Sequence, residues 1–211
     1  MPHIAAGAAF CAGIDASVKA PRARPPCFAP PSALRQAPLV APIEQRKQMA
    51  EPRRDVSNPA TMLSGGRIAI VEARFYDAVG AQLLEGAQRA IAAAGASCEV
   101  YRVPGALEIP LALGIVLDAA ARAGRPYDGA VALGCVIRGE TYHFEIVAGE
   151  SSRALMDLAV ARGLAFGNGV LTVENEAQAE VRADPAQGDK GGDAARSALA
   201  LAALKRQLGV K

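Results

Sequence analysis

Four short apolar runs recur along the chain, and each is followed by a segment with helical spacing. The runs cover residues 67–72, 98–103, 128–137 and 168–173. The third run is apolar almost without interruption, which is typical of a central parallel strand covered on both faces. Strands that alternate with helices indicate a parallel sheet joined by right-handed crossovers. The pattern therefore predicts an α/β fold, a three-layer α/β/α sandwich around a four-stranded parallel sheet.

The helical segments carry apolar residues three or four positions apart, which predicts one sheet-facing stripe on each helix. The expected stripes consist of Val79, Leu83, Ala87, Ala90, Ile91 and Ala94; Leu111, Ile115, Val116 and Ala119; Val147, Ser151, Ala154, Leu155 and Leu158; and Leu201, Leu204 and Leu208. A short helix is also expected from Glu176, before a loop over residues 183–188. Gly95, Gly124 and Gly163 are natural helix ends, because glycine adopts the left-handed backbone that follows many helices.

Residues 1–60 differ in composition from the rest of the chain. They hold ten of the fourteen prolines, and prolines block long helices and central strands. Their apolar residues also show no helical or strand-like period. We expect a disordered, Pro-rich extension here, followed by one domain over residues 61–211. A secretory signal fits poorly, because the first apolar patch lacks a basic start. An organelle transit peptide and a natural start at Met49 or Met62 are alternatives.

Charge and cysteine content exclude several classes of protein. The net charge of +2 gives no reason to expect nucleic-acid binding. No apolar run approaches the roughly 18 residues of a membrane span. The four cysteines form no CxxC pair, and Cys98 and Cys135 lie in strand-like runs, so we expect free buried thiols in a reducing cytoplasm. The common signatures of dinucleotide-binding folds, P-loops, zinc proteases and serine hydrolases are absent from the sequence.

The polar residues that follow each strand are the candidates for chemistry, because ligands of open α/β sheets bind at the carboxyl ends of strands. His143 follows the third strand and is an acid/base candidate near neutral pH, or else a surface histidine in a first helical turn. Thr141 is either a plain helix cap or part of a phosphate site at a helix N-terminus. Arg182 and Lys190 could supply positive charge, although each could equally be a solvated cation. Cys135 is expected to be a core residue.

Five motifs together resemble the 6,7-dimethyl-8-ribityllumazine synthase family, in its order and at its spacing from about Arg67 to the last helix. The motifs are Arg74-Phe75-Tyr76, Val103 to Pro110, Gly134 to His143, Gly169 to Asn175, and Asp189-Lys190-Gly191. The resemblance implies a flavodoxin-like fold. It also implies condensation of 5-amino-6-(D-ribitylamino)uracil with 3,4-dihydroxy-2-butanone 4-phosphate, which releases phosphate and water in riboflavin biosynthesis. No metal or organic cofactor is implied.

The resemblance also assigns roles to individual positions. Phe75 matches the aromatic residue that stacks on the pyrimidine, and His143 matches the proposed proton-transfer residue. The remaining matches are the ribityl-binding segment of Ala106, Leu107 and Glu108, the uracil contacts of Val136 and Ile137, the phosphate loop of Gly139, Glu140 and Thr141, the phosphate-binding Arg182, and Lys190 beside it.

Three positions depart from the family pattern. Leu107 stands where many members have Phe, and Asp189 stands where Asn is common. Asn168 stands where some members have a Phe that reaches into a neighbouring subunit's site, which puts the second aromatic wall in doubt.

Members of the family assemble as pentamers with sites shared between adjacent subunits, and some form sixty-subunit shells. We expect a homopentamer here, with a sixty-subunit shell as the alternative assembly. The alternative to the synthase reaction is a non-catalytic flavin- or lumazine-binding protein or a cage-forming homologue.

Overall fold

The computed structural model describes residues 63–210, so the extension expected over residues 1–60 lies outside the described residues. The strands are β1 (Arg67–Ala73), β2 (Ser97–Val103), β3 (Gly129–Ile137) and β4 (Phe166–Val173). The helices are α2 (Asp77–Ala93), α3 (Glu108–Arg122), α4 (His143–Arg162), α5 (Glu176–Ala183) and α6 (Lys190–Gln207). All four predicted strands are confirmed, with starts that differ by at most two residues from the expected ones.

The four strands form one parallel sheet in the order β2-β1-β3-β4. The chain moves from β1 to β2 on one side and then crosses to β3 on the other side of β1. This reversal leaves a crevice at the carboxyl ends of β1 and β3, where doubly wound α/β folds bind their ligands. The order and direction of the strands confirm the predicted flavodoxin-like sheet.

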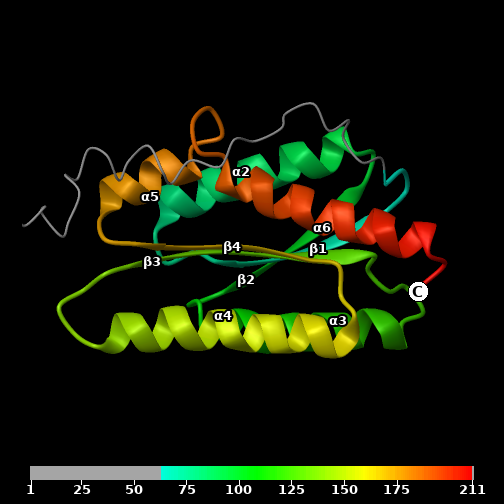
Figure 1. Ribbon diagram of the computed structural model, residues 1–211, viewed down its shortest axis with the longest axis horizontal. Coiled ribbons are helices and arrows are strands. Elements are labelled where there is room, and N and C mark those ends of the chain that lie inside the picture. The colour runs from blue at the N-terminus through cyan, green and yellow to red at the C-terminus, as the bar shows by residue number, and fades with distance from the viewer. Residues whose placement is uncertain (1–62, 211) are drawn as a thin grey trace, which may run out of the picture. The chain divides into compact units, whose positions relative to one another are not determined.

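Helices cover both faces of the sheet and complete the three layers (Figure 1). Helices α2, α5 and α6 lie on one face, and α3 and α4 lie on the other. β3 is buried along almost its whole length, as its apolar run predicts. None of the described helices is long and apolar enough to cross a membrane.

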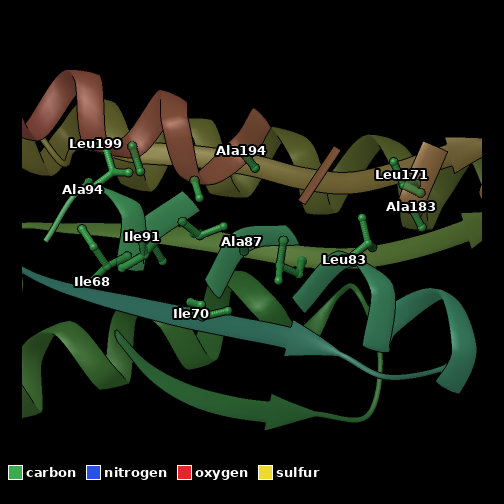
Figure 2. Close-up of a cluster of buried hydrophobic side chains, with 14 of the residues drawn as sticks. Ile68, Ile70, Leu83, Ala87, Ile91, Ala94, Leu171, Ala183, Ala194 and Leu199 are labelled. Carbon is green, nitrogen blue, oxygen red and sulfur yellow. The ribbon is translucent and has the colours of Figure 1, made fainter. Parts of the chain in front are cut away.

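The core under α2 and α6 depends on small residues that let the two helices approach closely (Figure 2). A Cβ atom at Gly191 would overlap the carbonyl group of Leu83 in α2, so only glycine fits this contact. The buried face of α6 is Gly191, Gly192, Ala194, Ala195, Ala198, Leu199 and Ala202. The predicted leucine stripe of α6 was wrong as the buried face, because Leu201, Leu204 and Leu208 are exposed.

The opposite core lies between the sheet, α3 and α4. Helix α3 buries Ile109, Leu113 and Leu117 against the sheet. The predicted stripe through Leu111 and Ile115 was wrong as the buried face, since these side chains are 69% and 68% exposed. Helix α3 is apolar on two sides, and spacing alone does not tell which side meets the sheet. On α4 the predicted positions Ser151 and Leu155 are buried, and Ser151 donates a hydrogen bond to the Val147 carbonyl at 2.6 Å.

Candidate active site

A pocket of about 430 Å³ opens at the carboxyl ends of β1, β2 and β3. Its walls come from three separate connections, one after each of these strands. The lining residues are Phe75, Tyr76, Gly105, Ala106, Leu107, Glu108, Cys135, Val136, Ile137, Gly139, Thr141, His143, Phe144 and Val147. The structure therefore brings together nine of the thirteen residues expected at the site, although they are spread over 69 positions of the sequence.

The first wall is the turn between β1 and α2. Phe75 is 71% exposed, which is unusual for a phenylalanine and leaves most of its side chain accessible to a ligand. The Phe75 ring packs edge-to-face against the Tyr76 ring, with the two ring centroids 5.1 Å apart, and this contact helps to hold both rings in place. Burial raises the pKa of the Tyr76 phenol, which keeps the hydroxyl protonated near neutral pH. Phe75 therefore lies on the pocket surface and is not part of the hydrophobic core.

The second wall is the turn between β2 and α3. Ala106 is buried, and Glu108 is the first residue of α3, where its negative charge suits the positive end of the helix dipole. The Glu108 N–H donates to the Gly105 carbonyl at 3.2 Å, which closes the turn. Because a Cβ at Gly105 would lie only 2.8 Å from Oε2 of Glu108, this glycine leaves the carboxylate room above the turn.

The third wall runs from the end of β3 into α4. Cys135 and Val136 are buried, Ile137 is half-buried, and Gly139, Thr141 and His143 are exposed along the rim. Helix α4 begins at His143 with Tyr142 as its N-cap, and no side chain caps it. The interpretation of Thr141 as a plain N-cap was therefore wrong, because the helix begins one residue later than a cap at Thr141 requires. The Tyr142 side chain thus makes no capping hydrogen bond to the first turn of α4.

Arg138 anchors this third connection outside the pocket. Its guanidinium pairs with Glu145 in α4 and with Glu174 after β4, the latter at 2.7 Å from Nε. The same group lies 4.1 Å from the ring centroid of Phe144, in the range of a cation–π contact. The hydrogen bond from Arg138 lowers the pKa of the Glu145 carboxyl. These contacts join the loop that carries Thr141 to two neighbouring elements.

Cys135 lies in the pocket wall but is a poor nucleophile. Burial raises the pKa of its thiol to about 11, so the reactive thiolate is scarce near neutral pH. Cys135 is a free, buried cysteine, as expected, whereas the free Cys98 is only half-buried on the edge strand β2. Within residues 63–210, no group of three or more His, Cys, Asp or Glu side chains is arranged to hold a metal ion.

Three expected site residues lie in a second depression, away from the pocket walls. Asn168, Arg182 and Lys190 line a shallow space of about 390 Å³ between β4, α5 and α6. Arg182 donates to the Gln178 carbonyl of its own helix at 3.0 Å, and Lys190 pairs with Asp193 at 3.0 Å. Asp189 caps α6 with φ of 45°, a left-handed conformation that Asn and Asp tolerate better than most residues. Glu140 is exposed and lines neither the pocket nor this depression.

Five residues that line the pocket are not among the predicted site residues. They are Tyr76, Gly105, Cys135, Phe144 and Val147; Tyr76 and Gly105 lie in the predicted strand-end turns. Tyr76 carried a signal, since it directly follows Phe75 in a strand-end turn. Phe144 and Val147 were harder to find, because apolar residues at the start of an amphipathic helix look like ordinary core positions.

Comparison with known sequences agrees with this geometry. A family model described as 6,7-dimethyl-8-ribityllumazine synthase matches residues 65–206. A protein of that name from Methylocella silvestris is 63% identical over 161 residues, which cover 76% of this chain and 98% of the relative. Proteins of the same name from Afipia carboxidovorans and Methylorubrum extorquens are 57% and 54% identical, over 76% and 78% of this chain and 98% and 95% of each relative. The chain therefore belongs to the 6,7-dimethyl-8-ribityllumazine synthase family.

Proposed function

We propose that this protein is the transferase that condenses 5-amino-6-(D-ribitylamino)uracil with 3,4-dihydroxy-2-butanone 4-phosphate. The products are 6,7-dimethyl-8-ribityllumazine, phosphate and water, and the step belongs to riboflavin biosynthesis. The observation that carries the proposal is the pocket itself, which gathers Phe75, Glu108 and His143 from three different strand ends. Family membership and high identity to named synthases support the same reaction.

The pocket suits the pyrimidine substrate in shape and polarity. The exposed ring of Phe75 can stack on the pyrimidine ring, and Glu108 can accept hydrogen bonds from ribityl hydroxyls. In this proposal the uracil edge binds to backbone groups at Val136 and Ile137, which line the pocket where β3 ends. An apolar floor with few polar groups is the usual composition of a small-molecule site.

His143 is the proton-transfer residue in this proposal. Amine attack on the ketone gives a carbinolamine and then an imine, after which phosphate is eliminated and the ring closes. Each of these steps moves a proton, and the exposed imidazole on the pocket rim can both accept and donate one. The pocket accelerates the reaction further by holding two substrates in contact.

The phosphate group needs positive charge and N–H donors. The start of α4, next to Gly139 and Thr141, offers backbone N–H groups of the kind that bind anions at helix N-termini, and the N-cap side chain makes no hydrogen bond to them. Arg182 and Lys190 carry the positive charge, but they line the depression beside β4. We infer that the depression of one subunit completes the pocket of the next, and that Asn168 takes the place of an aromatic residue there.

The family implies an oligomer, and we propose a homopentamer. Large apolar side chains stand exposed on the helices of the described domain, including Leu111, Ile115, Met156 and Val160. Such surface is typical of interfaces rather than of isolated monomers.

We assign the catalytic domain to residues 61–211. We place the enzyme in the reducing cytoplasm, in agreement with the free thiols of Cys98 and Cys135.

The test is an assay with purified protein and both substrates. Product fluorescence and released phosphate are followed together, against the slow spontaneous reaction without protein. Turnover with equal amounts of the two products supports the synthase. Tight binding of the pyrimidine or of a flavin with no turnover above the spontaneous rate would instead identify a non-catalytic binding protein.

A further inference from the structure

Glu72 is a charged side chain buried inside the domain. It is only 1% exposed, and it is the one acidic or basic residue in the buried class over residues 63–210. It lies near the carboxyl end of β1, between β2 and β3. An ionised carboxylate is costly to bury unless ion pairs and hydrogen bonds compensate it.

Two arginines satisfy the Glu72 carboxylate, one on each oxygen. Nε of Arg102 lies 2.6 Å from Oε1, and Nη2 of Arg74 lies 3.1 Å from Oε2. Arg102 is the register partner of Glu72 on β2, and its side chain is 65% exposed. Arg74 belongs to the turn that follows β1. A single buried group therefore connects the ends of two neighbouring strands.

These two arginines lead directly into two walls of the pocket. Arg74 precedes Phe75, and its aliphatic part packs on Gly80 of α2, where an added Cβ would lie 3.3 Å from Cγ of Arg74. Arg102 lies three residues before Gly105, which begins the wall of Ala106 and Glu108. The spacing between the aromatic wall and the Glu108 wall thus depends on where Glu72 holds both guanidinium groups.

We propose that Glu72 is a positioning residue that sets the separation of these two walls and thereby the affinity for the ribityl-pyrimidine. Glu72 does not line the pocket, so it acts only through Arg74 and Arg102. The identity of the ligand rests on the proposed function. The ion pairs of Glu72 reach only Arg74 and Arg102, and none of these three residues lines the third wall or the depression beside β4, so the KM for the sugar phosphate should be unaffected.

A purely structural ion pair would behave differently. Loss of stability alone lowers the amount of active enzyme, which reduces the apparent kcat and leaves both KM values unchanged. Loss of positioning raises the KM for the pyrimidine selectively. The two roles are therefore separable by measuring KM for each substrate with the other held at saturation.

The test uses Glu72→Gln, which keeps the shape of the side chain and removes its charge, together with Arg102→Gln. Because Arg102 is mostly exposed, its replacement preserves the Glu72–Arg74 pair and carries the test if Glu72→Gln does not fold. We expect the pyrimidine KM to rise on the order of tenfold, with kcat and the sugar-phosphate KM changed less than about twofold. Glu85→Gln is the matched control, because Glu85 forms an exposed pair with Arg89 on α2. Equal changes in both KM values, or none in either variant, would overturn the proposal.

A second readout does not depend on the reaction. The chain contains no tryptophan, so Phe75→Trp introduces a single fluorophore at the aromatic wall. We expect the anisotropy decay of Trp at this position to show more local motion when Glu72→Gln is added, but not when Glu85→Gln is added. Identical decays in the three proteins would contradict the positioning role. If the unmodified protein showed no turnover, the proposed function would fail while this measurement still tested Glu72.

Discussion

The pocket at the ends of β1, β2 and β3 and the depression beside β4 are built in different ways. Three turns enclose the pocket around an apolar floor; two of them continue the central strands β1 and β3, and the third continues the edge strand β2. The depression instead lies along the opposite edge strand, β4, with Asn168, Arg182 and Lys190 on its surface. The pocket can bind a flat heterocycle by itself. The depression offers positively charged side chains but has no enclosing wall. The proposed reaction needs both, so each region is half of a site.

Removal of the base in the pocket should have the largest effect. We expect His143→Ala to lower kcat by at least about a hundredfold, because general acid–base catalysis typically contributes that much or more. The helix should survive, since His143 is exposed at the start of α4 and the imidazole caps nothing. Steady-state kinetics and the mass of the native assembly check both statements. An unchanged kcat would remove His143 from the mechanism.

Removal of the cation in the depression should have the next largest effect. We expect Arg182→Ala to raise the KM for the sugar phosphate about thirtyfold, the typical loss of a charged hydrogen-bonding partner. The pyrimidine KM should change little, because Arg182 does not line the pocket. Arg89→Ala on α2 is the matched control, since Arg89 is exposed and pairs only weakly with Glu85 at 3.9 Å. A selective loss of pyrimidine binding would disprove the assignment of Arg182.

A mixture of these two variants tests whether the halves come from different subunits. Neither variant alone forms a complete site. In an assembly mixed at random in equal amounts, about one site in four combines an intact pocket with an intact neighbouring depression. With the sugar phosphate held well below its KM, where Arg182→Ala is nearly inactive, we expect co-expressed His143→Ala and Arg182→Ala subunits to recover about a quarter of the unmodified activity. If both halves came from one chain, the mixture would be no more active than the two variants measured separately.

Addition of an aromatic residue to the depression should have a small effect in the opposite direction. Asn168 is exposed on β4, and its side chain accepts a hydrogen bond from the Val170 N–H at 3.0 Å. We expect Asn168→Phe to lower the pyrimidine KM about threefold, because one added aromatic contact is worth roughly 0.5–1.5 kcal/mol. The measurement is the KM of the assembled enzyme. Asn168→Ala, which removes the amide without adding a ring, should not lower the KM.

The smallest effect is expected at Cys135, although its side chain lines the pocket. We expect Cys135→Ala to change kcat less than about twofold, because the buried thiol stays protonated.

The raised pKa of the Cys135 thiol, about 11, also makes the stability of the fold depend on pH. The unfolded thiol ionises from about pH 8.5, so the folded state holds more protons above that pH, and stability should fall between about pH 8.5 and 11. Urea unfolding of both proteins at pH 8 and pH 10.5 checks this, since Cys135→Ala should lose less stability over that interval.

The strands and the turns after them could be predicted because burial on both faces leaves a clear mark in the sequence. The run before Arg138 is apolar throughout, and its abrupt end locates one wall of the pocket. The helix faces could not be predicted in the same way. Leu111 on α3 and Leu201 on α6 are exposed in the single chain, and apolar periodicity does not distinguish a face that meets the sheet from one that meets another subunit.

The resemblance implies a site shared between subunits, but the sequence could not predict which of the expected site residues lie in which region. The motifs place Arg182 and Lys190 in the same functional set as His143, but spacing along the chain does not say which surface each one reaches. Glu72 shows a related difficulty. A glutamate near the end of a strand usually suggests exposure, and its burial depends on Arg102, a residue thirty positions away on the adjacent strand.

The contact between Gly191 and Leu83 has a consequence for assembly geometry. Helix α2 begins beside Phe75, and about 9 Å further along its axis it meets the start of α6, next to Lys190. This backbone contact fixes the angle between the pocket face and the depression face of one subunit. In a closed ring, that angle determines how many subunits complete the circle. In the proposed ring, the absence of a side chain at Gly191 would therefore help to set the number of subunits.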